Sequence, residues 1–167
     1  NGAFGLPGAV EDLHRDALRA QFETNVFGWQ ELTNLAIPVM RRQGYGRIIQ
    51  NSSVLGFVSL PFRGAYNASK YAIEGLSDTL RLELRGSNIY VSLIEPGPIS
   101  SQFRINAVKA LEKYIDVNNS FHRDKYQGVL TRLNKAGPAV PFTLPPEAVL
   151  KRVIHALEAP RPQPRYY

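Results

Sequence analysis

The segment RIIQNSSVLGFVSLPFRGAYNASK, from Arg47 to Lys70, decides the fold of this 167-residue chain. It opens with a short apolar run that ends in hydroxyls, residues 47–53, and such a run is typical of a buried strand. A loop then leads to a helical pattern over residues 65–85, for which Gly86 is the expected end. A second apolar run follows at residues 89–95. Strand, long helix and strand form a βαβ unit with parallel strands, so the sequence predicts an α/β fold.

A long amphipathic helix is predicted ahead of this unit, over residues 12–43. Its apolar residues recur at steps of three and four, which is the signature of one buried face. Pro38 falls late in this run and is expected to kink the helix.

The pattern is weaker after Pro96-Gly97-Pro98, which ends the second strand. Residues 101–114 and 121–133 are interpreted as short helices, and the segment 101–143 as a lid over a substrate pocket. A better marked helix opens at Pro145-Pro146 and runs to about residue 157. The final run, RPQPRYY, has no ordered pattern of its own.

Composition limits the class of protein and its partners. The chain is 44% hydrophobic and 20% charged, as expected for one globular domain, residues 1–167. No apolar run approaches the roughly 20 residues that a membrane-spanning helix needs. The absence of cysteine excludes disulfides and thiolate metal sites and is compatible with a cytoplasmic location. The net charge of +6 is spread along the chain, which disfavours nucleic acid as a partner but suits a phosphate-bearing cofactor.

Tyr66 and Lys70 lie four residues apart, on one face of the second predicted helix. On spacing alone, a solvated lysine beside a half-buried tyrosine is the more frequent arrangement. A cation beside a phenol, however, lowers the phenol pKa from its usual value of about 10. Ser53, at the carboxyl end of the preceding strand, could then hydrogen-bond the same substrate oxygen. This set suits general acid–base chemistry on a carbonyl/alcohol pair.

These residues resemble the active site of the classical short-chain dehydrogenases/reductases. In that family a serine, a tyrosine thirteen residues later and a lysine four residues beyond form the site, and Ser53, Tyr66 and Lys70 satisfy both intervals. Asn25, in FETNVFG, matches the fourth catalytic member, which is thought to hold a water for proton relay. The segments IEPGPIS and PPEAV match later motifs, and NGAFG looks like an altered Asn-Asn-Ala-Gly loop.

The resemblance implies a Rossmann-like doubly wound parallel sheet and a nicotinamide dinucleotide cofactor, NAD or NADP, with NADP favoured. Tyr66 would be the acid/base, Lys70 would lower its pKa and bind ribose hydroxyls, and Ser53 would orient the substrate oxygen. The implied cofactor contacts are Asn1, Tyr66, Lys70, Pro96, Gly97, Ile99 and Ser101.

The resemblance also bears on substrate and assembly. GLSDTLRLEL and VSLIEPGPI are similar to the branch that handles retinol-like, steroid-like and other lipophilic alcohols and ketones. The two long helices, 12–43 and 65–85, would form the contact of a homodimer or homotetramer.

Part of the family's pattern is missing from this chain. The phosphate-binding glycine loop, the residue that selects NAD or NADP and the first strands would all precede Asn1. We therefore expect a fragment truncated at both ends, with about two core strands, an open apolar sheet edge and no activity by itself.

Alternative roles for these residues stay open. Asn25 by itself is more often a capping or helix-bending residue, and Ser53 a strand-end hydroxyl. A serine hydrolase is disfavoured because no G-x-S-x-G occurs and the three histidines are scattered. These histidines also lack metal-ligand spacing. A non-catalytic truncated product or a dimerising scaffold of the same fold is the alternative function.

Overall fold

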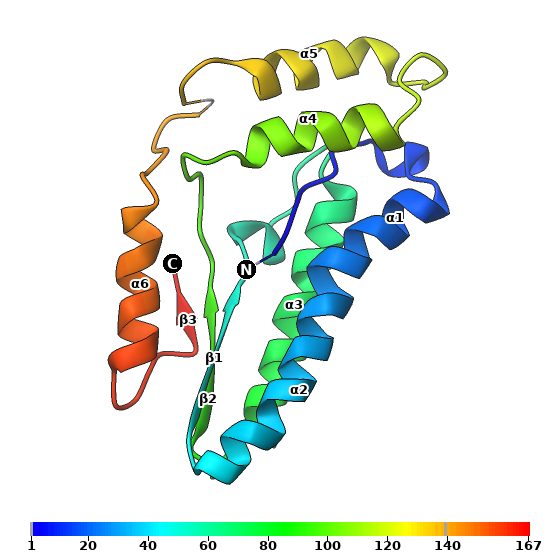
Figure 1. Cartoon of the computed structure of the whole chain (residues 1–167). Helices are drawn as coiled ribbons and strands as arrows, with labels where there is room; N and C mark the ends of the chain where they lie inside the picture. The colour runs from blue at the N-terminus through cyan, green and yellow to red at the C-terminus, as the bar shows by residue number, and fades with distance from the viewer. Residues whose placement is uncertain (1, 139) are drawn as a thin grey trace.

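The computed structural model describes residues 2–138 and 140–167, and it confirms the predicted parallel α/β architecture. Within these residues the sheet has three strands in the order β1-β2-β3: Gly46–Asn51, Ile89–Ile94 and Arg165–Tyr166. β1 and β2 pair in parallel along their whole length, from Gly46 opposite Ile89 to Asn51 opposite Ile94. The strands lie between two layers of helices (Figure 1).

Helices cover both faces of the sheet. The crossover helix α3, Gly64–Glu83, lies beside α2 on one face, and α6, Glu147–Glu158, lies on the other (Figure 1). Trp29 of α2, Ile73 of α3 and Leu93 of β2 form one buried cluster. On the opposite face, residues of α6 pack against β2 and β3. This two-sided covering is the doubly wound arrangement that the sequence predicts.

The helix predicted over residues 12–43 is one helical path with a change of pitch. It consists of α1, Arg15–Phe22, a π-helical turn at Glu23–Phe27, and α2, Gly28–Gln43. α2 continues through Pro38. It ends at Gly44, whose φ of 77° is left-handed, a conformation that glycine adopts without the steric cost of a Cβ.

The lid predicted over residues 101–143 contains two helices, α4 at Phe103–Tyr114 and α5 at Arg123–Asn134. Figure 1 shows both beyond the end of the sheet, over the start of α3. A second apolar core holds them there, and it includes the fully buried Tyr126 of α5. The Tyr126 hydroxyl donates to Asp12 at 2.6 Å and accepts from the backbone of Ala9 at 2.8 Å. These two helices are thereby fixed to the segment that precedes α1, and their role as a lid stays a prediction.

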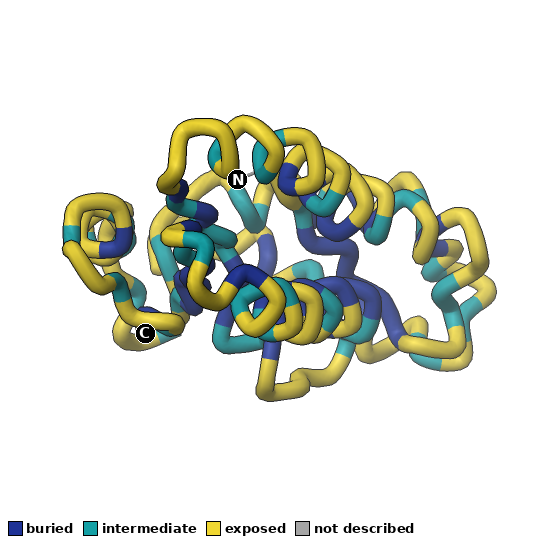
Figure 2. Tube along the Cα trace, turned by 90° about the horizontal axis from the view of Figure 1, so that it is seen from below, coloured by how far each residue is buried: buried dark blue, intermediate teal, exposed yellow. Residues whose placement is uncertain are grey.

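Burial follows the helix faces. In Figure 2 the exposed residues lie along the outer sides of the helices and the buried ones turn towards the interior. The outer face of α2 is not purely polar, because Leu32 and Leu35 are 69% and 68% exposed.

The end of the chain adds a strand to the two core strands that were predicted, in the run RPQPRYY, for which the sequence shows no ordered pattern of its own. The structure has a third strand, β3, whose Arg165 and Tyr166 pair in parallel with Leu93 and Ile94. Two residues are too few to show an alternating pattern. The strand is instead held in place by the packing of Tyr166 against Ile94 and α6.

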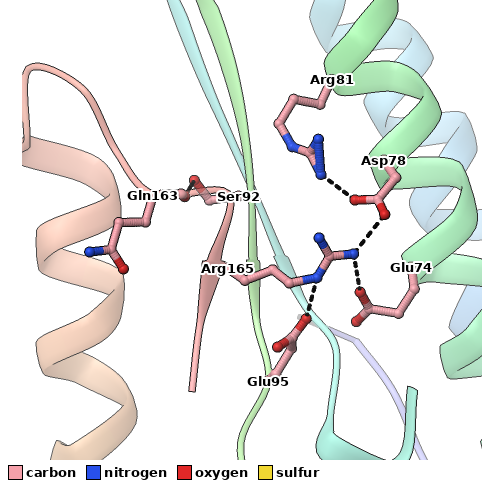
Figure 3. A network of polar contacts seen from close by, with 7 residues as sticks. All are labelled: Glu74, Asp78, Arg81, Ser92, Glu95, Gln163 and Arg165. Atoms are coloured by element: carbon pink, nitrogen blue, oxygen red, sulfur yellow. Dashed lines mark hydrogen bonds and ion pairs between the residues drawn. The ribbon is translucent and has the colours of Figure 1, made fainter. Parts of the chain in front are cut away.

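An ion-pair network also ties β3 to α3 across the sheet (Figure 3). The Arg165 guanidinium meets Glu95 at 3.0 Å, Asp78 at 2.6 Å and Glu74 at 3.3 Å. Glu95, which directly follows β2, is fully buried. Burial raises the pKa of Glu95 to about 7, the nearby Glu74 carboxyl contributes to the rise, and Arg165 opposes it.

We predict that Glu95→Gln removes a pH dependence of stability. Because the folded pKa of Glu95 lies above the unfolded value, its stabilising contribution is complete at low pH and is lost as the pH rises towards 7. Relative to the wild type, the variant should gain at most about 1.4 kcal/mol per pH unit between pH 5 and 7. Urea denaturation at pH 5 to 8 measures this, with Asp78→Asn as a control that shows no such gain. Parallel pH profiles for Glu95→Gln and wild type would show that Glu95 stays ionised.

Candidate active site

The carboxyl ends of β1 and β2 lie side by side, as predicted for parallel neighbours. The Ser52 amide donates to the Ile94 carbonyl at 2.7 Å, and the Val54 amide to the Pro96 carbonyl at 3.2 Å. The chain that leaves β1 therefore lies against the Pro96-Gly97 turn. Ligands of open α/β sheets bind at this edge.

Ser53 turns the chain directly after β1. Its hydroxyl oxygen accepts the Leu55 amide at 3.1 Å, which caps the short 3₁₀ turn Val54–Gly56. The loop then returns to α3, where the Asn67 side chain donates to the Val58 carbonyl at 2.7 Å. These contacts fix the loop and bring the first turn of α3, with Tyr66, back to Ser53.

Tyr66 is buried, with 8% of its surface exposed. Burial raises the pKa of its phenol above the usual value, while a hydrogen bond from Ser53 and the positive charge of Arg63 oppose the rise. The phenol is therefore neutral at physiological pH. Ser53 and Tyr66 are together, as the thirteen-residue interval predicts.

Lys70 is 1% exposed, and its ammonium donates to the carbonyl of Asn51, the last residue of β1, at 2.7 Å. The same ammonium lies 4.5 Å from the centre of the Trp29 ring and 5.6 Å from that of Tyr66. Burial lowers the pKa of Lys70 to about 8, and Glu74 opposes the fall. Lys70 is absent from the charges that lower the Tyr66 pKa, because its ammonium faces a backbone carbonyl and the tyrosine ring. The charge of Arg63 opposes the rise of the Tyr66 pKa, and the role of Lys70 towards the phenol stays a prediction.

Asn25 lies in the π-helical turn and is fully buried. Its amide oxygen accepts the Phe4 amide at 3.1 Å, and its nitrogen donates to the Phe4 carbonyl at 3.0 Å and to the Ser69 hydroxyl at 3.1 Å. Ser69 in turn donates to the Tyr66 carbonyl at 2.7 Å. Asn25 is thus connected to the helix that holds Tyr66 and Lys70, and its water-holding role stays a prediction.

The predicted cofactor contacts follow β2. A Cβ added at Gly97 would meet open space, and Ile99 forms a parallel bridge with Leu144 of the lid side. Ser101 is exposed and its hydroxyl accepts the Phe103 amide at 3.3 Å. Asn1, the remaining predicted contact, lies outside the described residues.

The sequence pattern did not select Trp29, Phe103 or Arg63 as site residues. Trp29 belonged to the apolar stripe of its helix, yet its ring packs beneath the Lys70 ammonium. Phe103 belonged to the lid, and its ring centre lies 5.2 Å from that of Tyr66. Arg63 precedes Tyr66 by three residues, and this helical spacing is the signal that could have identified it.

The described residues show neither a metal centre nor a membrane-spanning helix. Among the described residues, no group of three or more His, Cys, Asp or Glu side chains is placed to hold a metal ion. None of the described helices has both the length and the apolar character needed to cross a membrane.

Comparison with known proteins establishes the family. The family model described as short chain dehydrogenase matches residues 1–112. The chain belongs to the short-chain dehydrogenase family, a family of oxidoreductases, as the Ser53, Tyr66 and Lys70 pattern predicts.

Individual relatives agree with this assignment. The chain is 43% identical over 166 residues to an uncharacterized oxidoreductase, YbbO, of Escherichia coli (strain K12), with 99% of this chain and 55% of that protein covered. It is 34% identical over 169 residues to 17-beta-hydroxysteroid dehydrogenase type 1 of Homo sapiens, with 100% and 50% covered. The chain thus spans about half the length of these curated relatives.

A solved structure shows the same fold. It is a 4-hydroxyisoleucine dehydrogenase mutant complexed with NADH and succinate, with a TM-score of 0.71 at 21% sequence identity. The match covers 95% of this chain and 59% of that one.

The burial of Lys70 leads to a prediction about its titration. The midpoint should lie near pH 8, and Glu74→Gln should lower it further, because the variant removes the negative charge that raises this pKa. NMR of the lysine side-chain nitrogens measures the midpoint. Asp78→Asn is the matched control, one turn further along α3, and should leave the midpoint unchanged. A Lys70 midpoint near the ordinary lysine value of about 10.4 would contradict the burial argument.

Proposed function

We propose that the protein is an NAD(P)-dependent oxidoreductase that interconverts an alcohol and a ketone or aldehyde. The observation that carries this proposal is the pairing of the Ser53 hydroxyl with the buried Tyr66 phenol, one helical turn from the buried Lys70 ammonium. A structural tyrosine and lysine on a helix surface would not need a serine partner or this degree of burial.

The residues beside the pair fit a nicotinamide dinucleotide. An ammonium has three donors, and one of those on Lys70 is used by Asn51, so donors remain for ribose hydroxyls. The open space at Gly97 leaves room for a planar ring beside the Pro96-Gly97 turn. Ile99 and Ser101 follow this turn in the chain and are the next proposed cofactor contacts. The net charge of +6 suits NADP, which carries an additional phosphate.

The side chains then divide the work of proton transfer. The raised pKa keeps the Tyr66 phenol protonated, so it can donate a proton to a carbonyl oxygen during reduction. The Ser53 hydroxyl hydrogen-bonds the same oxygen and fixes its position. Lys70 binds the ribose hydroxyls of the cofactor and thereby orients it. Asn25 supports a water of the proton relay. The cofactor, when bound, supplies or accepts the hydride.

A lipophilic substrate is favoured by what surrounds Tyr66. The Phe103 ring packs edge-on against the phenol, and Gly5 also lies close to this ring. A substrate at Tyr66 would therefore lie against an aromatic wall contributed by α4. The name of the human relative, a hydroxysteroid dehydrogenase, points to the same class of alcohols and ketones.

We place the contact of a homodimer or homotetramer on the two long helices. Leu32, Leu35 and Val39 of α2 are 69%, 68% and 44% exposed, which is a substantial apolar surface for a helix face. The same surface favours the alternative function, a dimerising scaffold without catalysis. Size-exclusion chromatography with cofactor titration separates the two, because a scaffold would associate without binding the dinucleotide.

Replacement of the proposed acid tests the catalytic function. Tyr66→Phe in the full-length protein should reduce kcat at least about 100-fold, because general acid catalysis of this kind contributes about 10²–10⁴. The assay follows NAD(P)H oxidation by absorbance with a panel of lipophilic ketones and aldehydes. Tyr71→Phe, an exposed tyrosine of the same helix, is the matched control and should retain wild-type kcat. Wild-type activity in Tyr66→Phe would reject the proposed site.

A further inference from the structure

A pocket of about 340 Å³ opens between the loop that precedes α3 and the lid helix α5. Residues 60–63 line one side, and Lys125, Gly128, Val129 and Arg132 line the other. These four positions of α5 recur at helical spacing, so they form one face of the helix. The pocket is therefore a junction between the loop that positions Tyr66 and one face of the lid.

The charged side chains of this pocket are all cations: Arg63, Lys125 and Arg132. Arg63 is only 8% exposed. Across residues 2–138 and 140–167, its guanidinium has neither an ion pair nor a hydrogen bond, whereas the buried Glu95 of the same protein meets Arg165. Arg63 is a buried charge without a counter-charge, in a pocket that two further cations enter.

Burial and the neighbouring cation disfavour the charged form of Arg63, and a bound anion would offset both effects. Burial lowers the pKa of Arg63 to about 10, and the like charge of Arg132 contributes to the fall. No carboxylate opposes these effects, and the Tyr66 phenol alone does. An oxyanion between the three cations would remove the repulsion and supply the missing partner. A guanidinium binds a carboxylate or phosphate through two parallel hydrogen bonds.

The position of the pocket indicates where such an anion comes from. Arg63 precedes Tyr66 by three residues at the start of α3, which is about 4.5 Å along a helix axis. The Arg63 guanidinium and the Tyr66 phenol also influence each other's pKa, so the two groups are near enough for one small molecule to contact both. Leu60, Pro61 and Val129 provide apolar surface for the carbon skeleton in between.

We propose that this pocket binds an anionic oxygen group of the substrate, a carboxylate or phosphate, while the reacting carbonyl or alcohol lies at Tyr66. The inference rests on the proposed function and narrows its substrate to a lipophilic alcohol or carbonyl compound that carries an acidic group. Arg63 and Arg132 are the specificity-determining residues.

Anion binding is tested first, without any turnover. Titration of the full-length protein with benzoate and with inorganic phosphate, followed by NMR, should show saturable binding of at least one of them. Arg132→Gln, on the exposed face of α5, should weaken that binding about tenfold or more. Gly128→Leu should do the same by filling the pocket, because a Cβ at Gly128 meets no neighbouring atom and the fold can accept it. Lys113→Gln, an exposed cation of α4, is the control and should bind as the wild type does.

Turnover then tests the source of the anion. A keto acid, the phosphate monoester of a matched hydroxyketone and their neutral amide or ester analogues are compared by kcat/KM. One acidic substrate should exceed its neutral analogue at least about tenfold, and Arg132→Gln should abolish this ratio. Arg63→Gln, if it folds, should also abolish the preference for the acidic substrate. If it does not fold, Arg132→Gln and Gly128→Leu test this preference.

The outcomes separate the two proposals. Absence of turnover with every carbonyl compound would reject the oxidoreductase function, whatever the anion titration shows. Turnover of acidic and neutral substrates at equal kcat/KM would overturn the pocket's role in substrate binding. Anion binding that Arg132→Gln and Gly128→Leu leave unchanged would overturn the pocket itself.

Discussion

The hydrogen bond from the Lys70 ammonium to the carbonyl of Asn51 is the contact on which the site depends. It joins α3 to the last residue of β1 at 2.7 Å, at the level of the sheet where the strands end. A buried ammonium is costly unless its donors are satisfied and its charge is balanced. Here the carbonyl satisfies one donor, the faces of Trp29 and Tyr66 lie beside the charge, and Glu74 balances it. This contact holds α3 against the end of β1, and Tyr66 lies one turn away from the same point.

The other site residues also stabilise the structure that holds them. Ser53 caps the turn that leaves β1 before it meets the Tyr66 phenol. Asn25 fastens Phe4 to the π-helical turn and, through Ser69, to the backbone of Tyr66. Each of these candidate groups is thus held by hydrogen bonds of the fold, and groups held in this way form a preorganised site. The charges beyond the site are balanced in one place and unbalanced in another: Arg165 is surrounded by three carboxylates, whereas Arg63 has none.

The elements that the sequence predicted well are those with a strong period or clear terminal signals. The strand, helix and strand from β1 to β2 were predicted to within two residues, because a long helical period is bounded by two short apolar runs. Gly86, the expected end of α3, has a φ of 83° and lies three residues beyond Glu83. β3 was missed because it has two residues, and a contact with β2 defines it rather than any pattern of its own.

Some features of the candidate site could be predicted from the sequence, and others could not. The interval from Ser53 to Tyr66 agrees with the structure, in which the two side chains are neighbours, because the end of β1 and the start of α3 lie at the same edge of the sheet. The direction of the Lys70 ammonium could not be predicted, because a long flexible side chain goes to the acceptor that the packed structure offers, here the carbonyl of Asn51. The cationic pocket at Arg63 was equally invisible, since it depends on α5, which lies far along the chain from Arg63.

The sequence by itself determined the class of fold and the family, and it selected the candidate reacting groups, because these follow from local periods and short fixed spacings. Only the tertiary structure decided how those groups are charged. Burial and neighbouring charges set the pKa values of Tyr66, Lys70 and Glu95, and both depend on segments that are distant in sequence and close in space.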